Sequence, residues 1–263
     1  MTTLEDVLAD LEAESAQLQD WVAPLEADRW ATVTTPEGWT VAHQIGHLAW
    51  TDEASCAAIK QDPAFAAGMK AAAANPTGFV DEGAEQWAAK EPAALVQAWE
   101  AGRQRLAEAL RAVPEGEKIA WFGPPMSPTS MATARIMETW AHGHDVAEAL
   151  GITPPRSDRC RHVCHIGIRT RGFAYLVRGQ EAPAVDVHVA LTAPSGELWT
   201  WGPLDAPERV TGSGYDFALL ATRRRHLDDV DVHAEGEHAA HWLTIVQAFA
   251  GLPGNDPLRL ADR

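Results

Sequence analysis

The sequence predicts an α+β protein of two domains: an N-terminal up-down four-helix bundle over residues 1–154 and a smaller α+β domain over residues 155–263. A chain of 263 residues can bury the cores of two ordinary domains. Four segments with the apolar spacing of helices precede the Pro154-Pro155 pair, and segments with the alternation of strands follow it. Because consecutive prolines end a helix, we expect the domain boundary at this pair.

Apolar residues at spacings of three and four predict each helix of the bundle. The expected helices cover residues 4–25, 41–59, 92–113 and 129–150. Thr40 can cap the second helix, Pro92 fits the first turn of the third, and Gly151 can cap the end of the fourth. Between the second and third helices, residues 62–86 are rich in Ala, Gly, Asn and Pro, which predicts an irregular or partly helical connection.

The second domain combines helices with short strands. We expect helices over 158–177, 215–224 and 239–249, a hairpin of strands 185–191 and 198–201, and a short strand over 230–233. This mixture is typical of an α+β domain.

The charge balance excludes two classes of partner. With 21 basic and 37 acidic residues, the chain has a formal net charge of −16 and would repel nucleic acid and anionic membranes. No apolar stretch approaches the roughly 20 residues needed to span a bilayer, and the N-terminus lacks a signal-peptide pattern, so we expect a cytoplasmic protein. Cys56, Cys160 and Cys164 form no CxxC pair and are expected to be free thiols.

Two pairs of side chains on the second and fourth predicted helices indicate a metal site. Glu138 and His142 are four residues apart and share one helix face, and His43 and His47 have the same spacing among apolar residues. Side chains from facing helices of a bundle often converge on one ion. Two imidazoles and one carboxylate suit zinc, with iron or nickel as alternatives, and three protein ligands leave a position open for substrate. Alternatively, either pair could bind no metal and lie on a solvated helix face or in the core.

Two neighbouring residues are candidates to orient the ligands. Asp145 lies three residues beyond His142, where it can accept a hydrogen bond from the free ring nitrogen. His43 either has a role of this kind, as a ligand or beside one, or is a histidine bonded to the backbone near the start of its helix.

Both motifs resemble those of a known family. The segment from Gly38 to Ala49 resembles the second-helix signature of DinB-like metal-binding bundles, in the branch of the mycothiol-dependent maleylpyruvate isomerases, where the histidine eight positions after the tryptophan is a metal ligand. The run from Arg135 to Asp145 resembles the second motif of that branch, whose glutamate and histidine complete the ligand set. The resemblance therefore implies a DinB-like bundle with the metal ligands His47, Glu138 and His142.

The resemblance extends to the second domain through residues 185–201 and 210–225, whereas position 43, often acidic in the family, is a histidine here. It implies one divalent metal, with zinc expected, and a low-molecular-weight thiol such as mycothiol as cosubstrate. The thiol would react with a small electrophilic substrate by S-transfer or cis–trans isomerisation. Arg223 and Arg225 are candidates to bind carboxylates of the substrate or the thiol, the alternative being cations that stabilise the end of a helix.

Two other functions fit the same residues. A non-catalytic binding or interaction protein could keep the metal while its second domain recognises a small ligand or a partner. A non-haem iron oxygenase also uses two histidines and one carboxylate, although the four-helix arrangement matches the thiol-using family better. The sequence leaves open the substrate, the choice between transferase and isomerase, and the oligomeric state.

Overall fold

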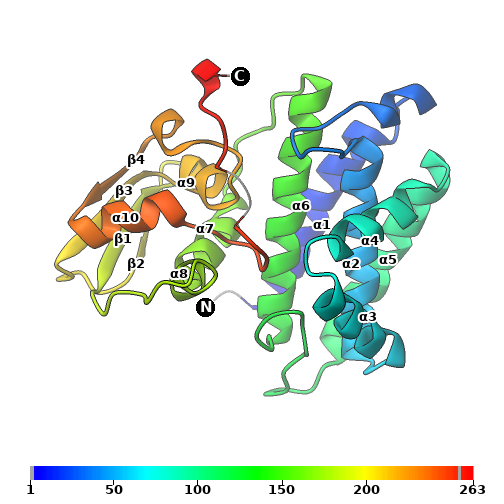
Figure 1. The fold of residues 1–263 in the computed structure, drawn as a ribbon, viewed down its shortest axis with the longest axis horizontal. Helices are drawn as coiled ribbons and strands as arrows, with labels where there is room; N and C mark the ends of the chain where they lie inside the picture. The colour runs from blue at the N-terminus through cyan, green and yellow to red at the C-terminus, as the bar shows by residue number, and fades with distance from the viewer. Residues whose placement is uncertain (1–2, 254–255, 263) are drawn as a thin grey trace. The chain divides into compact units, whose positions relative to one another are not determined.

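The computed structural model describes residues 3–253 and 256–262. The chain forms two compact units; the first ends at Pro154 and the second begins at Pro155. The first unit is helical and the second contains a small sheet with helices, so the predicted fold class is confirmed (Figure 1). None of the helices in the described part of the chain is both long and apolar enough to cross a bilayer.

Four long helices frame the described part of the first unit. They are α1 (Leu4–Val22), α2 (Val41–Ile59), α5 (Pro92–Ala112) and α6 (Pro128–Leu150). Each predicted helix of the bundle is found, and its bounds agree to within three residues. The caps agree as well, because Thr40 precedes α2 and Gly151 ends α6 with a positive φ of 71°. A short 3₁₀ turn, η1 (Ala27–Ala31), follows α1.

The helices α3 (Pro63–Ala74) and α4 (Phe79–Ala88) occupy the stretch for which the sequence predicts an irregular or partly helical connection. Asp62 caps α3 by accepting a hydrogen bond from the backbone N–H of Ala64 at 2.8 Å. A Cβ atom on Gly46 of α2 would lie 2.8 Å from the carbonyl oxygen of Ala84, so glycine allows α4 to pack closely on α2. The connection is therefore more regular than predicted, because it packs against a helix that has room for it.

Apolar side chains form two clusters in the first unit. One contains Leu106 and Ile136, and the other contains Leu48 and Trp99. Burying a leucine or isoleucine side chain contributes about 1.5–3 kcal/mol to folding, so both clusters stabilise the first unit. The facing helices α2 and α6 also bury polar side chains, among them Gln44, His47, Asp52, Arg135 and His142.

In the described part of the second unit, four strands form one sheet. They are β1 (Val187–Thr192), β2 (Leu198–Trp201), β3 (Glu208–Ser213) and β4 (Val232–Glu235), in the order β2-β1-β3-β4. β1 and β2 form the predicted antiparallel hairpin, β3 runs parallel to β1, and β4 is antiparallel to β3. The accompanying helices are α7 (Cys160–Arg169), α8 (Arg171–Leu176), α9 (Gly214–Ala221) and α10 (Glu237–Ile245), with 3₁₀ turns η2 (Leu227–Asp229) and η3 (Leu260–Asp262).

Several details of the second unit differ from the prediction. The helix expected over 158–177 is broken at Thr170, whose Oγ1 donates to the carbonyl of Gln247 at 2.7 Å. β3 is not predicted, because Val210 is its only apolar side chain and the segment shows no alternation. The helix expected over 215–224 already ends at Ala221, β4 begins two residues later than predicted, and α10 ends at Ile245.

Candidate metal centre

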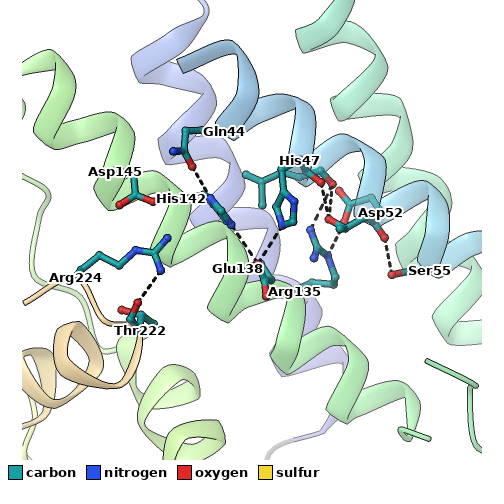
Figure 2. Close-up of polar contacts among 12 residues, drawn as sticks. Gln44, His47, Asp52, Ser55, Arg135, Glu138, His142, Asp145, Thr222 and Arg224 are labelled. Carbon is teal, nitrogen blue, oxygen red and sulfur yellow. Dashed lines mark hydrogen bonds and ion pairs between the residues drawn. The ribbon is translucent and has the colours of Figure 1, made fainter. Parts of the chain in front are cut away.

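The side chains of His47, Glu138 and His142 converge between α2 and α6 (Figure 2). His47 projects from α2, while Glu138 and His142 lie one turn apart on α6. The Oε2 atom of Glu138 is 3.3 Å from Nε2 of His47 and 3.2 Å from Nε2 of His142. The structure thus brings together the three side chains that the sequence predicts as ligands.

Two of the three distances in this group fit a tetrahedral metal ion. Two ligand atoms that lie about 2.0–2.1 Å from a zinc ion, at the tetrahedral angle, are about 3.3 Å apart. The two N···O distances, 3.3 and 3.2 Å, match that edge, and the three ligand atoms lie within 4.8 Å of one another. As direct N–H···O hydrogen bonds, the same distances would be at the long end of the usual range.

Gln44 determines how the ring of His142 faces this site. The Nε2 group of Gln44 donates to Oγ1 of Thr34 at 2.7 Å. Its Oε1 therefore faces His142 and accepts a hydrogen bond from the Nδ1–H group. The Nε2 atom of a neutral His142 therefore directs a lone pair at Oε2 of Glu138. Two acceptors that face each other repel unless a proton or a metal cation stands between them, and the residues present thus fit a bound cation.

Glu138 supplies the negative charge of the site. Burial acts to raise the pKa of this carboxyl, but the interactions with His142 and His47 outweigh burial and hold its pKa well below the usual range. The Glu138 side chain is 22% exposed, whereas those of His47 and His142 are 9% and 11% exposed. The carboxylate is thus ionised at neutral pH beside two nearly buried imidazoles.

Aromatic contacts hold the ring of His47. The ring centroid lies 5.5 Å from that of Trp39 and 6.0 Å from that of Trp50. The Nδ1 atom of His47 is buried and has no hydrogen-bond partner among the described residues. Trp39 also stacks on His142 at 5.8 Å, and its Nε1 donates to Asp81 of α4 at 2.9 Å. The indole therefore contacts both histidines and is itself tied to the neighbouring helix.

Asp145 is buried near His142, but it is not the nearest partner of the ring. Its Oδ2 atom lies 3.9 Å from Nδ1 of His142, which is beyond hydrogen-bonding distance, and Gln44 makes the short contact instead. Gln44 was not predicted from the sequence. The signal that could have found it is a glutamine three residues before His47, on the same apolar face of the same helix.

His43 makes its hydrogen bonds away from the three ligand candidates. Its Nδ1 accepts from the backbone N–H of Thr40 at 3.2 Å, and its Nε2 lies 2.7 Å from Oε2 of Glu85. The first contact satisfies a free backbone group at the start of α2, and the second connects α2 to α4. Of the two alternatives, the geometry favours a histidine that caps its helix.

The arginines predicted to bind carboxylates lie in the second unit, just beyond α9. The backbone N–H groups of Arg223 and Arg224 donate to carbonyls of α9 at 2.9 and 2.8 Å in the pattern of a Schellman motif. Arg223 has a φ of 61°, in the left-handed region that glycine usually occupies. Its guanidinium pairs with Asp256, and Nη1 of Arg225 donates to the Arg224 carbonyl at 2.7 Å.

Arg223 and Arg225 also line a cavity within the second unit. Its volume is about 200 Å³. The other polar residues that line it are His226, Asp228, Thr244 and Asp256. The cavity thus combines two guanidinium groups with two carboxylates, and the guanidinium of Arg223 is already paired with Asp256.

Comparison with known protein families and sequences finds clear relatives. The family model of the mycothiol maleylpyruvate isomerase N-terminal domain matches residues 11–147, more than half of the chain. A second model, described as wyosine base formation, matches residues 183–235. Two uncharacterized proteins of Mycobacterium tuberculosis, from strains CDC 1551 / Oshkosh and ATCC 25618 / H37Rv, are each 56% identical over 247 residues, which cover 94% of this chain and 96% of the relative.

Two solved structures share the fold. The crystal structure of the mycothiol-dependent maleylpyruvate isomerase has a TM-score of 0.60 at 18% identity, and the match covers 90% of this chain and 96% of that one. A histidine-to-alanine mutant of that isomerase has a TM-score of 0.59 at 17% identity with the same coverage.

Proposed function

The chain belongs to the mycothiol maleylpyruvate isomerase family, and from this premise we propose that it is a metal-dependent enzyme that uses a low-molecular-weight thiol. Its reaction is either the cis–trans isomerisation of a small electrophile or the transfer of the thiol to one. The observation that carries the proposal is the convergence of two imidazole nitrogens and one carboxylate oxygen at the spacing of a tetrahedral ion.

The three ligand side chains would leave one coordination position for the thiol. His47, Glu138 and His142 contribute one negative charge, which leaves a divalent ion with a net positive charge and favours an anionic fourth ligand. Zinc bound there would lower the pKa of a coordinated thiol, so that the nucleophilic thiolate forms near neutral pH. The rings of Trp39 and Trp50 pack beside His47, and His47 and His142 are nearly buried, which limits the access of water to both rings.

The cysteines of this chain support an external thiol. Cys56, Cys160 and Cys164 are free thiols, as the sequence predicts, and all three are buried. Burial raises the pKa of the Cys56 thiol to about 11 and the pKa of the Cys164 thiol well above its ordinary value. Neither thiol is a nucleophile near pH 7, and Cys160 is fully buried, which favours a reactive sulfur that comes from a cosubstrate. The solved relatives are described as mycothiol-dependent, and we propose mycothiol as that cosubstrate.

Arg223 and Arg225 are the proposed carboxylate-binding residues. They line the 200 Å³ cavity of the second unit, and guanidinium groups bind carboxylates through paired hydrogen bonds. The carboxylate could belong to the substrate or to the thiol.

The first experiment is elemental analysis of the purified protein beside His47→Ala and Glu138→Ala. We expect about one equivalent of zinc in the wild type and none in either variant, because each loses one of three ligands. His43→Ala is the matched control, since His43 lies on the same helix outside the ligand set and should keep the metal. Full retention of zinc in the ligand variants would refute the site.

The second experiment tests the reaction. The zinc-loaded protein is incubated with a maleyl-type cis alkene, with and without mycothiol, and both products are measured. A rate that needs mycothiol and leaves it unconsumed identifies an isomerase, whereas formation of a thioether adduct identifies a transferase. Zinc binding without any thiol-dependent rate, for either this alkene or a panel of alkylating electrophiles, would favour a metal-containing binding protein.

A further inference from the structure

A chain of hydrogen bonds leads from the loop before α2 into the candidate metal centre. Oγ1 of Thr34 donates to the carbonyl oxygen of Trp39 at 3.0 Å, and Nε2 of Gln44 donates to Oγ1 of Thr34 at 2.7 Å. Oε1 of Gln44 accepts from Nδ1 of His142. Gln44 is fully buried and Thr34 is 6% exposed, so water does not compete for these bonds.

The direction of this chain is determined at its outer end. The Trp39 carbonyl can only accept, so the Thr34 hydroxyl has to donate to it and is left with lone pairs for the amide of Gln44. The amide must therefore present its NH₂ group to Thr34 and its oxygen to His142. A backbone carbonyl outside the helix thus specifies the orientation of a side chain inside the core.

The opposite orientation would disable the site. If Gln44 presented its NH₂ group to His142, Nδ1 would have to accept, and the proton of the neutral ring would sit on Nε2. That proton would point at Oε2 of Glu138, 3.2 Å away, and form an ordinary hydrogen bond in the space of the cation. The amide orientation therefore decides whether His142 is a metal ligand or a hydrogen-bond donor.

We propose that Gln44 is the positioning residue of the metal centre. Gln44 holds His142 in the tautomer with a free Nε2, and the Thr34–Trp39 loop sets the orientation of Gln44. This inference rests on the proposed function, because it concerns a cation held by His47, Glu138 and His142. The loop is suited to this role. Thr34 N–H donates to the same Trp39 carbonyl at 2.8 Å, and the Trp39 ring stacks on His142.

The test uses four variants of the full-length protein, with zinc affinity as the readout. Gln44→Leu removes the acceptor for His142, Gln44→Glu keeps an acceptor, and Thr34→Val removes the hydroxyl that orients the amide. Ser55→Ala is the matched control. Ser55 is equally buried on α2, but its hydroxyl bonds to the carbonyl of Thr51 and to Met131, away from the ligands.

Zinc affinity is measured by competition with a chromophoric chelator, and folding of each metal-free variant by circular dichroism. We expect Gln44→Leu to bind zinc about 10- to 100-fold more weakly, as is typical when a residue that orients a ligand is lost. Gln44→Glu should stay close to the wild type, Thr34→Val should show a smaller loss than Gln44→Leu, and Ser55→Ala should show none. The visible absorption of bound Co²⁺ should change most in Gln44→Leu, where the His142 ring loses its acceptor, less in Thr34→Val, and not in Ser55→Ala.

Each contrary result has a distinct meaning. Equal zinc affinity in the wild type and Gln44→Leu overturns this inference and leaves the proposed function intact, whereas a wild type without zinc overturns both. A loss in Gln44→Glu as large as in Gln44→Leu shows that an acceptor for Nδ1 of His142 is not sufficient and contradicts this inference. If Gln44→Leu does not fold, Thr34→Val decides, and an affinity equal to the wild type then refutes the inference.

Discussion

Two polar clusters lie between the same two helices, and they balance their charge in different ways (Figure 2). In the first, Nε of Arg135 donates to Oδ1 of Asp52 at 2.8 Å, so one buried cation meets one buried anion. In the second, Glu138 faces two histidines whose Nε2 atoms converge on one of its oxygens. The first cluster is complete within the chain. The second contributes one carboxylate and two imidazoles, a donor set that fits an added cation.

The comparison teaches how to distinguish a structural polar cluster from a binding site in a helical core. Burial alone does not separate them, because Asp52 and Arg135 are even less exposed than the ligand candidates. Burial raises the pKa of Asp52, with Arg135 acting against it, so even the complete pair is costly to desolvate. What separates the clusters is the partner of each carboxylate. Asp52 meets the guanidinium of Arg135, whereas Glu138 meets the imidazoles of His47 and His142.

The largest effect is expected from breaking the complete pair. Arg135→Ala leaves the Asp52 carboxylate buried and unpaired, which should lower the free energy of unfolding by about 3–5 kcal/mol. Chemical denaturation of the metal-free protein measures it. Arg105→Ala is the control, since its ion pair with Glu53 is exposed and should contribute less than about 1 kcal/mol. Zinc should still bind to Arg135→Ala if it folds. Loss of zinc there would mean that the two clusters act as one unit.

A smaller effect is expected from adding zinc to the second cluster. Zinc at a hundredfold excess over its Kd should raise the free energy of unfolding of the wild type by about 2.7 kcal/mol, because the ion binds only the folded site. Glu138→Gln lacks the ligand charge and should show no such gain. Denaturation with zinc and with a chelator makes the comparison. An equal gain in both proteins would place the zinc at another site.

The smallest effect is expected at His43, which touches neither cluster. His43→Ala removes the acceptor for Thr40 N–H and the contact with the exposed Glu85, and it should cost about 1 kcal/mol. Zinc affinity should not change. A weaker zinc affinity in this variant, measured by chelator competition, would support the other alternative from the sequence, in which His43 is a ligand or lies beside one.

Local patterns in the sequence predict much of the fold. Apolar spacing, Thr40 and Gly151 predict the four long helices nearly to the residue, because helix periodicity and caps depend only on neighbours in the chain. The break at Thr170 and strand β3 were not predicted, because both depend on residues that are distant in the chain. Thr170 bonds to the distant Gln247, and β3 exists through its pairing with β1 and β4.

The same division applies to the candidate site. By itself the sequence determined that Glu138 and His142 share a helix face, because four residues make about one turn, and its resemblance to a family selected His47 as the third ligand. Only the tertiary structure decided that Gln44, and not Asp145, orients His142, since that depends on how closely α2 and α6 approach and on a carbonyl in another loop. Spacing along one helix specifies which side chains share a face, but the partner across the core depends on packing.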